Sequence, residues 1–308
     1  MWRKKLLPAL MLICLLGFLS ASRVGGQEEG NKEVKQEAAE TNSYAGVEEC
    51  AACHEEEVEA LKKTPHGQAA FALRSSHACE TCHGPGQAHV DSGGEPGTIR
   101  NLASLKGDEA SQVCLGCHES GKRSNWKGSV HQQRELACVT CHTVHHPKSD
   151  NWQLKTARVE ETCNGCHVAL KAQIQRTSHH PVREGLMSCN DCHNPHGTLT
   201  PKLIKANSVN EQCYTCHTEK RGPFLWSHPP VQENCLNCHA PHGSNHEKLL
   251  VQNRPWLCQS CHLDTRHPGT LYDGTNQLTS NREISRSCSN CHLNIHGSNH
   301  PSGRVFTR

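Results

Sequence analysis

The chain of 308 residues has little of what usually forms a protein core. Hydrophobic residues make up 34% of it and aromatic residues only 4%, whereas nearly half of a typical globular chain is apolar. This scarcity disfavours an enzyme fold built around an ordinary hydrophobic core. Lys and Arg, 32 in all, almost balance the 30 Asp and Glu, and no basic stripe with interleaved aromatic residues occurs. Nucleic acid is therefore not an expected partner.

Long apolar runs are missing beyond the N-terminus. Residues 1–22 combine three basic residues, an apolar run from Leu6 to Leu19 and small residues before Ser22, which is the pattern of a cleaved secretory signal peptide. A second candidate cleavage site follows Gly26. The apolar run is too short for a spanning helix, which needs about 20 residues. Residues 23–46 are polar and rich in Glu and Lys, which predicts a tether before a domain at 47–308.

Cysteine and histidine are abundant instead, with 21 Cys and 25 His. Every cysteine except Cys14 falls in one of ten Cys-x-x-Cys-His motifs, the attachment pattern of c-type haem. Positions i, i+3 and i+4 share one face of a helical turn, so two thiols can form thioethers with the haem vinyl groups while the imidazole reaches the iron. A zinc knuckle, a redox pair or a disulfide does not require His after the second cysteine in ten motifs of ten.

Ten covalently attached haems c would supply the apolar mass that the side chains lack. The cysteines that form their thioethers are Cys50, Cys53, Cys79, Cys82, Cys114, Cys117, Cys138, Cys141, Cys163, Cys166, Cys189, Cys192, Cys213, Cys216, Cys235, Cys238, Cys258, Cys261, Cys288 and Cys291. The proximal iron ligands are His54, His83, His118, His142, His167, His193, His217, His239, His262 and His292. Ser208 and Glu211 form a capping-box pattern just before Cys213, which predicts a short helix that carries that motif.

The second axial ligands are predicted to be histidines as well. Methionine is nearly excluded, because Met1 and Met11 leave with the signal peptide and only Met187 remains. Fifteen of the 25 histidines lie outside the ten motifs, and bis-histidine ligation throughout favours low haem potentials. The motifs form five successive pairs, with one His between the members of each pair and another soon after the second member.

These two sets total ten histidines, the number required. The between-motif set is His66, His131, His180, His228 and His267, and the after-motif set is His89, His145, His196, His242 and His296. The five histidines left over, expected at the surface or beside ligands, are His77, His146, His179, His246 and His300. His179 rivals His180, and His300 rivals His296. The repeat leaves open which distal His serves which haem, and a neighbouring pair can supply it.

The fold class that follows is a multihaem cytochrome c, mostly irregular with short α-helices, elongated, organised around a row of ten haems and with little or no β-sheet. The first motifs of successive pairs are 64, 49, 50 and 45 residues apart. Five dihaem repeats of this size are expected to stack along one direction. Pro-rich turns punctuate the haem-binding segments.

The motifs and the segments around them resemble the periplasmic decahaem cytochromes of the MtrA/DmsE/PioA family. The likeness covers residues 47–308 and is carried by the segments Thr81–Pro85, Ser188–Gly197, Cys213–Pro223 and His296–Gly303. In that family, bis-histidine haems form a wire inside an outer-membrane β-barrel. The resemblance therefore implies several partners: an outer-membrane β-barrel porin, a periplasmic or inner-membrane cytochrome donor, and an extracellular multihaem cytochrome or terminal reductase. It also implies a place in the periplasm at the outer membrane, and His180 rather than His179.

The sequence thus favours an electron carrier, not an enzyme: a conduit across the outer membrane for extracellular electron transfer. A row of ten haems could cover a bilayer about 40 Å thick including headgroups. A soluble periplasmic shuttle with the same haems is the alternative. A multihaem reductase needs an open iron site, often signalled by Lys in place of the last His, and none of the ten motifs varies. The direction of electron flow, the terminal donor or acceptor and the individual haem potentials stay open.

Overall fold

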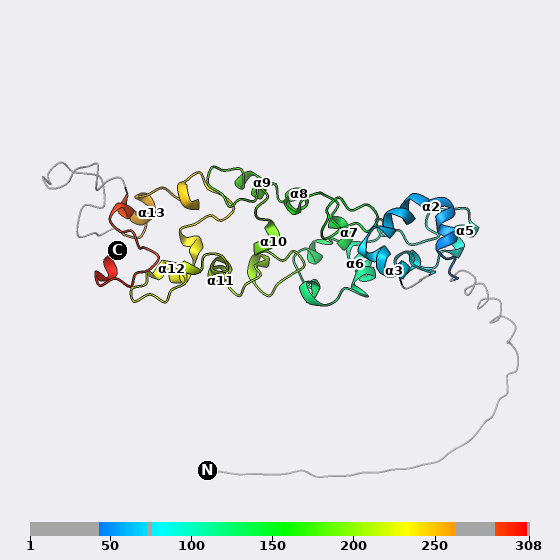
Figure 1. Ribbon diagram of the computed structural model, residues 1–308, viewed down its shortest axis with the longest axis horizontal. Coiled ribbons are helices and arrows are strands. Elements are labelled where there is room, and N and C mark those ends of the chain that lie inside the picture. The colour runs from blue at the N-terminus through cyan, green and yellow to red at the C-terminus, as the bar shows by residue number, and fades with distance from the viewer. Residues whose placement is uncertain (1–42, 73–75, 263–286, 307–308) are drawn as a thin grey trace, which may run out of the picture.

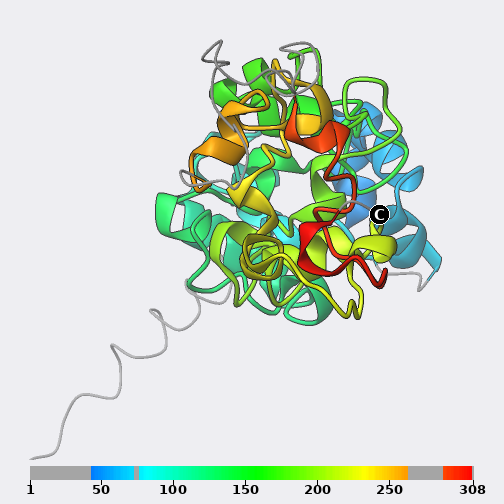
Figure 2. The ribbon, with the colours of Figure 1, turned by 90° about the vertical axis from the view of Figure 1, so that its left-hand side faces the viewer.

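The computed structural model of the chain describes residues 43–72, 76–262 and 287–306. They form an elongated molecule in which the chain advances from one end to the other (Figure 1). The view along the long axis shows a rounded cross-section (Figure 2). The predicted signal peptide, most of the predicted tether and His267 lie outside the described residues.

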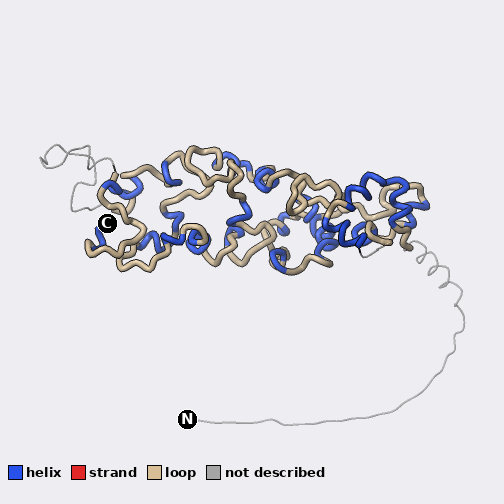
Figure 3. Tube along the Cα trace, viewed as in Figure 1, coloured by secondary structure: helices blue, strands red, loops and turns tan. Residues whose placement is uncertain are grey.

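Short helices joined by loops make up the described part, and this confirms the predicted fold class (Figure 3). The α-helices are α2 (Val47–Lys62), α3 (Pro65–Ala72), α4 (Glu80–His83), α5 (Gln87–Asp91), α6 (Gly107–Leu115), α7 (Cys138–Cys141), α8 (Val159–Asn164), α9 (Val168–Gln173), α10 (Cys189–Cys192), α11 (Val209–Tyr214), α12 (Pro229–Glu233) and α13 (Trp256–Gln259). The 3-10 helices are η1 (Gly121–Arg123), η2 (Gln132–Arg134), η3 (Pro201–Leu203), η4 (Thr218–Lys220), η5 (Cys235–Asn237), η6 (Glu247–Leu249), η7 (Cys288–Asn290) and η8 (Gly303–Val305).

Within the described ranges there is no β-strand, only five isolated antiparallel bridges. Three of them join a motif histidine to the loop that follows it, as His193 does with Ile204. The other two, Ser178 with Ser244 and Trp226 with Ser298, join segments far apart in the sequence. Backbone hydrogen bonds of 2.8–3.0 Å run in both directions across these two bridges. They tie the segment between the two motifs of one pair to the segment after the second motif of the next pair.

The side-chain core is small, as the composition predicts. Only eleven hydrophobic residues of the described part are buried, and three of these are alanines. Large side chains such as Leu186 and Leu199 are mostly exposed. None of the described helices is both long and apolar enough to span a membrane. Contacts between apolar side chains therefore contribute little to the stability of this fold.

Glu80 anchors the start of the described chain. Its carboxylate, only 1% exposed, accepts hydrogen bonds from the backbone N–H groups of Ala45, Gly46 and Gly86 at 2.7–3.1 Å and contacts Nδ1 of His77 at 3.0 Å. Burial by itself would raise the pKa of Glu80, but these hydrogen bonds together outweigh it and lower the pKa. Residues 43–46, predicted to belong to the tether, thus contact the haem-binding domain.

We expect Glu80→Gln to destabilise the protein by about 2–3 kcal/mol near neutral pH, because charge-assisted hydrogen bonds to a buried carboxylate are lost. A folded-state pKa below the unfolded value means that this contribution is present above the ordinary glutamate pKa and is lost as the pH falls through the folded pKa. Denaturant unfolding of the two holoproteins at several pH values measures the difference. The difference in free energy of unfolding should narrow in acid. Glu48→Gln, which removes an exposed carboxylate of α2, should change the free energy of unfolding little. An equal effect of both variants would contradict the prediction.

Candidate haem sites

The Cys-x-x-Cys-His motifs, numbered 1 to 10 in chain order, each place their side chains on one helical turn. In motifs 2 to 10 the backbone N–H of the histidine donates to the carbonyl of the first cysteine at 2.9–3.0 Å. Motif 1 lies within α2, where His54 departs from helical geometry (φ −121°, ψ 42°). No disulfide joins any of the twenty motif cysteines. The spacing therefore gives two free thiols and an imidazole on one face, as thioether attachment of haem requires.

The predicted cap of motif 7 is present in part. The Ser208 hydroxyl accepts from the backbone N–H of Glu211 at 3.1 Å and starts α11. The Glu211 carboxylate contacts Arg221 at 3.1 Å. The cap starts a short helix that carries Cys213, as expected.

Nine of the ten motif histidines face a histidine that the sequence selects as a distal ligand. Their ring centroids lie 5.7–6.5 Å apart. Two imidazole nitrogens that each lie about 2 Å from one metal ion hold their ring centroids about 6 Å apart. The facing pairs are His54 with His89, His83 with His145, His118 with His66, His142 with His196, His167 with His131, His193 with His242, His217 with His180, His239 with His296, and His262 with His228.

The facing pairs follow a regular rule for which distal histidine serves which motif, a choice that the sequence repeat left open. From motif 2 to motif 9, each motif histidine faces a distal candidate from a neighbouring motif pair. The first motif of a pair faces the between-motif His of the preceding pair, as His217 faces His180. The second motif faces the after-motif His of the following pair, as His193 faces His242. His54 faces His89 of its own pair. The predicted partner of His292, by exclusion His267, lies outside the described residues.

Backbone carbonyls orient the histidines of the even-numbered motifs. The Nδ1 atoms of His142, His193 and His239 lie 2.6–2.8 Å from the carbonyls of Trp152, Lys202 and Lys248, residues with positive φ, and His83 and His292 also contact carbonyls. A carbonyl only accepts, so Nδ1 carries the proton and Nε2 keeps the lone pair that binds a metal. Sequence reasoning missed these acceptors, although Lys-Leu recurs at the same distance after His193 and His239.

Three of the between-motif histidines are oriented by the residues that precede other distal candidates, and His66 is oriented by the Gln153 side chain at 2.8 Å. Nδ1 of His131 lies 2.7 Å from the Pro195 carbonyl, and Nδ1 of His180 lies 2.8 Å from the Pro241 carbonyl. His228 likewise donates to the Ile295 carbonyl. The residue after each acceptor is His196, His242 or His296. One short segment therefore presents a distal candidate and orients a second one.

Three of the after-motif histidines, His196, His242 and His296, are kept neutral by burial. Burial, with smaller contributions from nearby basic groups, lowers the pKa of His196 and of His296 to about 4, and burial also lowers the pKa of His242. Neutral imidazole is the form that binds iron. Gly197 and Gly243 follow two of these residues with φ of +111° and +146°, and a Cβ at either would lie 2.0 Å from a backbone carbonyl oxygen. Glycine thus permits the close packing that places the imidazoles.

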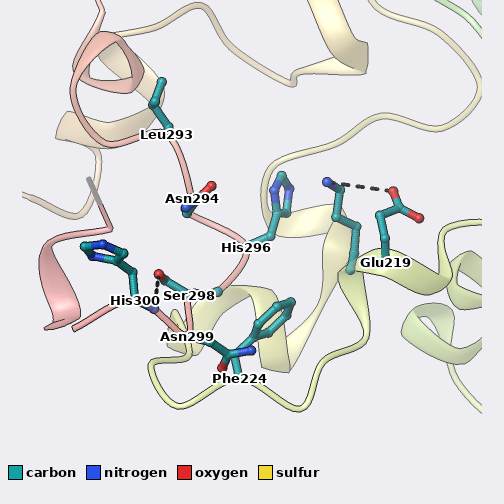
Figure 4. Close-up of a pocket in the computed structure, with 10 residues that line it drawn as sticks. Glu219, Phe224, Leu293, Asn294, His296, Ser298, Asn299 and His300 are labelled. Atoms are coloured by element: carbon teal, nitrogen blue, oxygen red, sulfur yellow. Dashed lines mark hydrogen bonds and ion pairs between the residues drawn. The ribbon is translucent and has the colours of Figure 1, made fainter. Parts of the chain in front are cut away.

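The geometry separates the two rival pairs of histidines. His179 uses both ring nitrogens, Nδ1 at 2.6 Å from the Arg176 carbonyl and Nε2 at 3.1 Å from Glu184, whereas His180 keeps Nε2 for its facing partner. Figure 4 shows His296 and His300 around a cavity of about 330 Å³ near the C-terminal end. His296 faces His239 at 6.2 Å, whereas Nδ1 of His300 accepts from the Ser302 N–H. The arrangement favours His180 and His296.

His180→Ala is expected to turn one of the ten haems from low-spin to high-spin, because the His217 side would keep a single axial imidazole. His179→Ala should leave all ten low-spin, since its contacts with Arg176 and Glu184 are structural. Electron paramagnetic resonance of the ferric proteins distinguishes the two outcomes. A high-spin signal from the His179 variant alone would reverse the choice.

The motif cysteines form a continuous series along the molecule. The first cysteines of the two motifs in a pair lie close together, as Cys50 does with Cys79 and Cys114 with Cys138. The second cysteine of each even motif lies near the second cysteine of the next odd motif, as Cys82 does with Cys117. Burial and the neighbouring thiol raise the pKa of Cys79 to about 11. Thioethers form at the vinyl edges of haem. Haem attachment sites that follow one another in the sequence are therefore also neighbours in space.

The described part holds no cluster of three or more His, Cys, Asp or Glu side chains arranged to bind a bare metal ion. Two thiols, a proximal imidazole and a facing imidazole at a metal-spanning distance fit a c-type haem at nine motifs.

Comparison with known proteins agrees with this chemistry. Residues 179–222 and 228–267 match the doubled CXXCH motif family, and residues 79–158 match the NrfB-like cytochrome c-type proteins. The chain is 40% identical over 332 aligned positions to the multiheme cytochrome MtrA of Shewanella baltica (strain OS185), covering 99% of this chain and 98% of that protein. It is 29% identical to the cytochrome c-type protein NrfB of Escherichia coli O6:H1, over 38% of this chain and 63% of NrfB. It is 24% identical to the high-molecular-weight cytochrome c of Nitratidesulfovibrio vulgaris, over 48% of this chain and 25% of that protein.

Proposed function

This chain belongs to the MtrA family of multihaem cytochromes, which transfer electrons through covalently bound c-type haems, and from that premise we propose that it is an electron conduit across the outer membrane. Ten haems, arranged along the molecule in the order of their motifs, carry electrons from one end to the other inside a partner β-barrel. The observation that carries the proposal is the set of nine facing histidine pairs, which extends from His54 with His89 to His239 with His296.

We assign both axial positions of every haem to histidine. The nine facing pairs supply eighteen of the ligands, and His292 with His267 supplies the last two. When bound, c-type haem supplies one-electron redox chemistry. The cysteines would hold each group to its helical turn, and the two facing imidazoles of each site would both bind its iron. A closed iron has no place for a substrate, which supports a carrier and not an enzyme.

A β-barrel partner is needed to separate the irregular backbone of this chain from lipid. Its described part consists of short helices and irregular loops. Irregular backbone cannot face lipid, because unsatisfied N–H and C=O groups cost several kcal/mol each in hydrocarbon. A surrounding outer-membrane β-barrel separates such a chain from lipid. A periplasmic or inner-membrane cytochrome at one end and an extracellular multihaem cytochrome or terminal reductase at the other complete the path.

The test is purification from detergent-solubilised outer membranes, followed by haem staining and identification of proteins that co-purify in fixed stoichiometry. A barrel protein in tight complex is the expected result. Recovery of the cytochrome alone in the osmotic-shock fluid would refute the membrane-crossing role and would establish a soluble periplasmic shuttle instead.

A further inference from the structure

The haem site of motif 2 differs from the others in how its two imidazoles are held. Among the facing pairs of the described part, the other eight have one ring whose Nδ1 lies within hydrogen-bonding distance of a protein acceptor. At motif 2 both rings have one. His83 contacts the Arg100 carbonyl at 2.9 Å, and His145 contacts the Glu57 backbone carbonyl at 3.4 Å. The Glu57 carboxylate adds a negative charge beside the same ring, with Oε2 3.2 Å from Nδ1 of His145, whereas the Glu219 carboxylate lies 3.9 Å from Nδ1 of His217 at motif 7.

The position of Glu57 is set by packing between distant segments. Glu57 lies on α2, 88 residues before His145, and its own backbone carbonyl lies 3.4 Å from the same Nδ1. Its Oε2 also lies 3.1 Å from Nε2 of His146. The side chains of Glu57 and His145 are 46% and 29% exposed, so the contact is only partly screened by water. The carboxylate is thus held between two adjacent imidazoles, one of which faces His83.

We propose that Glu57 is a positioning residue that gives the haem of motif 2 the most negative reduction potential of the nine described sites. The inference rests on the ligand pairs assigned above. A negative charge beside a hydrogen-bonded Nδ1–H group makes the imidazole a more basic ligand than a neutral carbonyl alone does. A more basic ligand stabilises ferric over ferrous iron, because the ferric ion carries the higher charge. The second hydrogen bond, from His83 to Arg100, acts in the same direction.

The experiment compares Glu57→Gln with Glu56→Gln in the holoprotein. Both variants remove one carboxylate from α2, but Glu56 is exposed and its side chain has no hydrogen bond or ion pair in the described part. A redox titration followed by haem absorbance, together with the ferric electron paramagnetic resonance spectrum, is the readout. Haem content shows first that both variants carry all their haems.

In the titration of Glu57→Gln, the component with the most negative reduction potential should account for about a tenth of the absorbance change. We expect its preference for the ferric state to fall roughly tenfold. This change raises the reduction potential of a one-electron couple by about 59 mV. One low-spin signal should shift with it. Glu56→Gln should move neither. Equal shifts in both variants, or no shift in Glu57→Gln, would overturn the proposal, because the first indicates only a long-range charge effect and the second no effect of the contact.

His145→Ala separates this inference from the ligand assignment. A high-spin haem in that variant together with unchanged potentials in Glu57→Gln refutes only the role of Glu57. If His145→Ala leaves all haems low-spin, the assigned ligand itself is wrong, and the proposal about Glu57 falls with it.

Discussion

His242→Ala is expected to turn one of the ten haems high-spin and to raise its reduction potential by at least about 59 mV, a tenfold change for a one-electron couple. The ring of His242 faces His193 at 6.0 Å, and its burial lowers its pKa, so it is presented as a neutral ligand. Its loss would leave the iron of motif 6 with one imidazole. An oxidising site in the middle of the row would retain electrons and slow transfer from end to end.

The matched control for this variant is His246→Ala, in the same loop. The side chain of His246 faces no motif histidine in the described part, so its removal should leave the spectrum and the potentials unchanged. Electron paramagnetic resonance and a redox titration measure both properties. An unchanged spectrum for the His242 variant would show that another side chain binds this iron.

The chain without its haems is expected to be unfolded, which is the largest effect on stability that the structure predicts. The eleven buried hydrophobic residues of the described part are too few for a domain of this size, whose folding must offset the conformational entropy of every ordered residue. The free energy of unfolding of an ordinary domain is only about 5–15 kcal/mol. Losing the apolar mass of ten macrocycles is expected to remove all of that stability.

Circular dichroism and limited proteolysis of the apoprotein, made in cells that lack haem attachment, test this expectation. We expect little helix and rapid cleavage throughout. A cooperative thermal transition of the apoprotein would contradict the prediction and would mean that the loops pack without haem. A variant with Cys138 and Cys141 both replaced by Ala serves as an intermediate, since it should lose one haem and be more labile between α6 and α8.

The sequence was sufficient for the chemistry and for the class of fold. The motif spacing predicts the single helical turns, and the composition predicts the small core. The scheme by which neighbouring pairs exchange histidines could not be predicted, because a histidine between two motifs lies at similar sequence distances from several proximal ligands. His179 and His180 are equivalent in composition, and only the contacts of His179 with Arg176 and Glu184 distinguish them. The acceptors at Trp152 and Lys202 act through backbone carbonyls, which side-chain identity does not reveal.

The exchange of histidines between neighbouring motif pairs has a consequence for how the protein matures. A chain that emerges N-terminus first presents motif 2 well before His145, and motif 6 well before His242. With the ligand pairs proposed here, each even-numbered site before motif 10 has an open iron until the following segment arrives to close it. Maturation would then be stepwise, with every new pair of motifs completing the one before it, and a chain that stops early would lack the second histidine of its last even-numbered site.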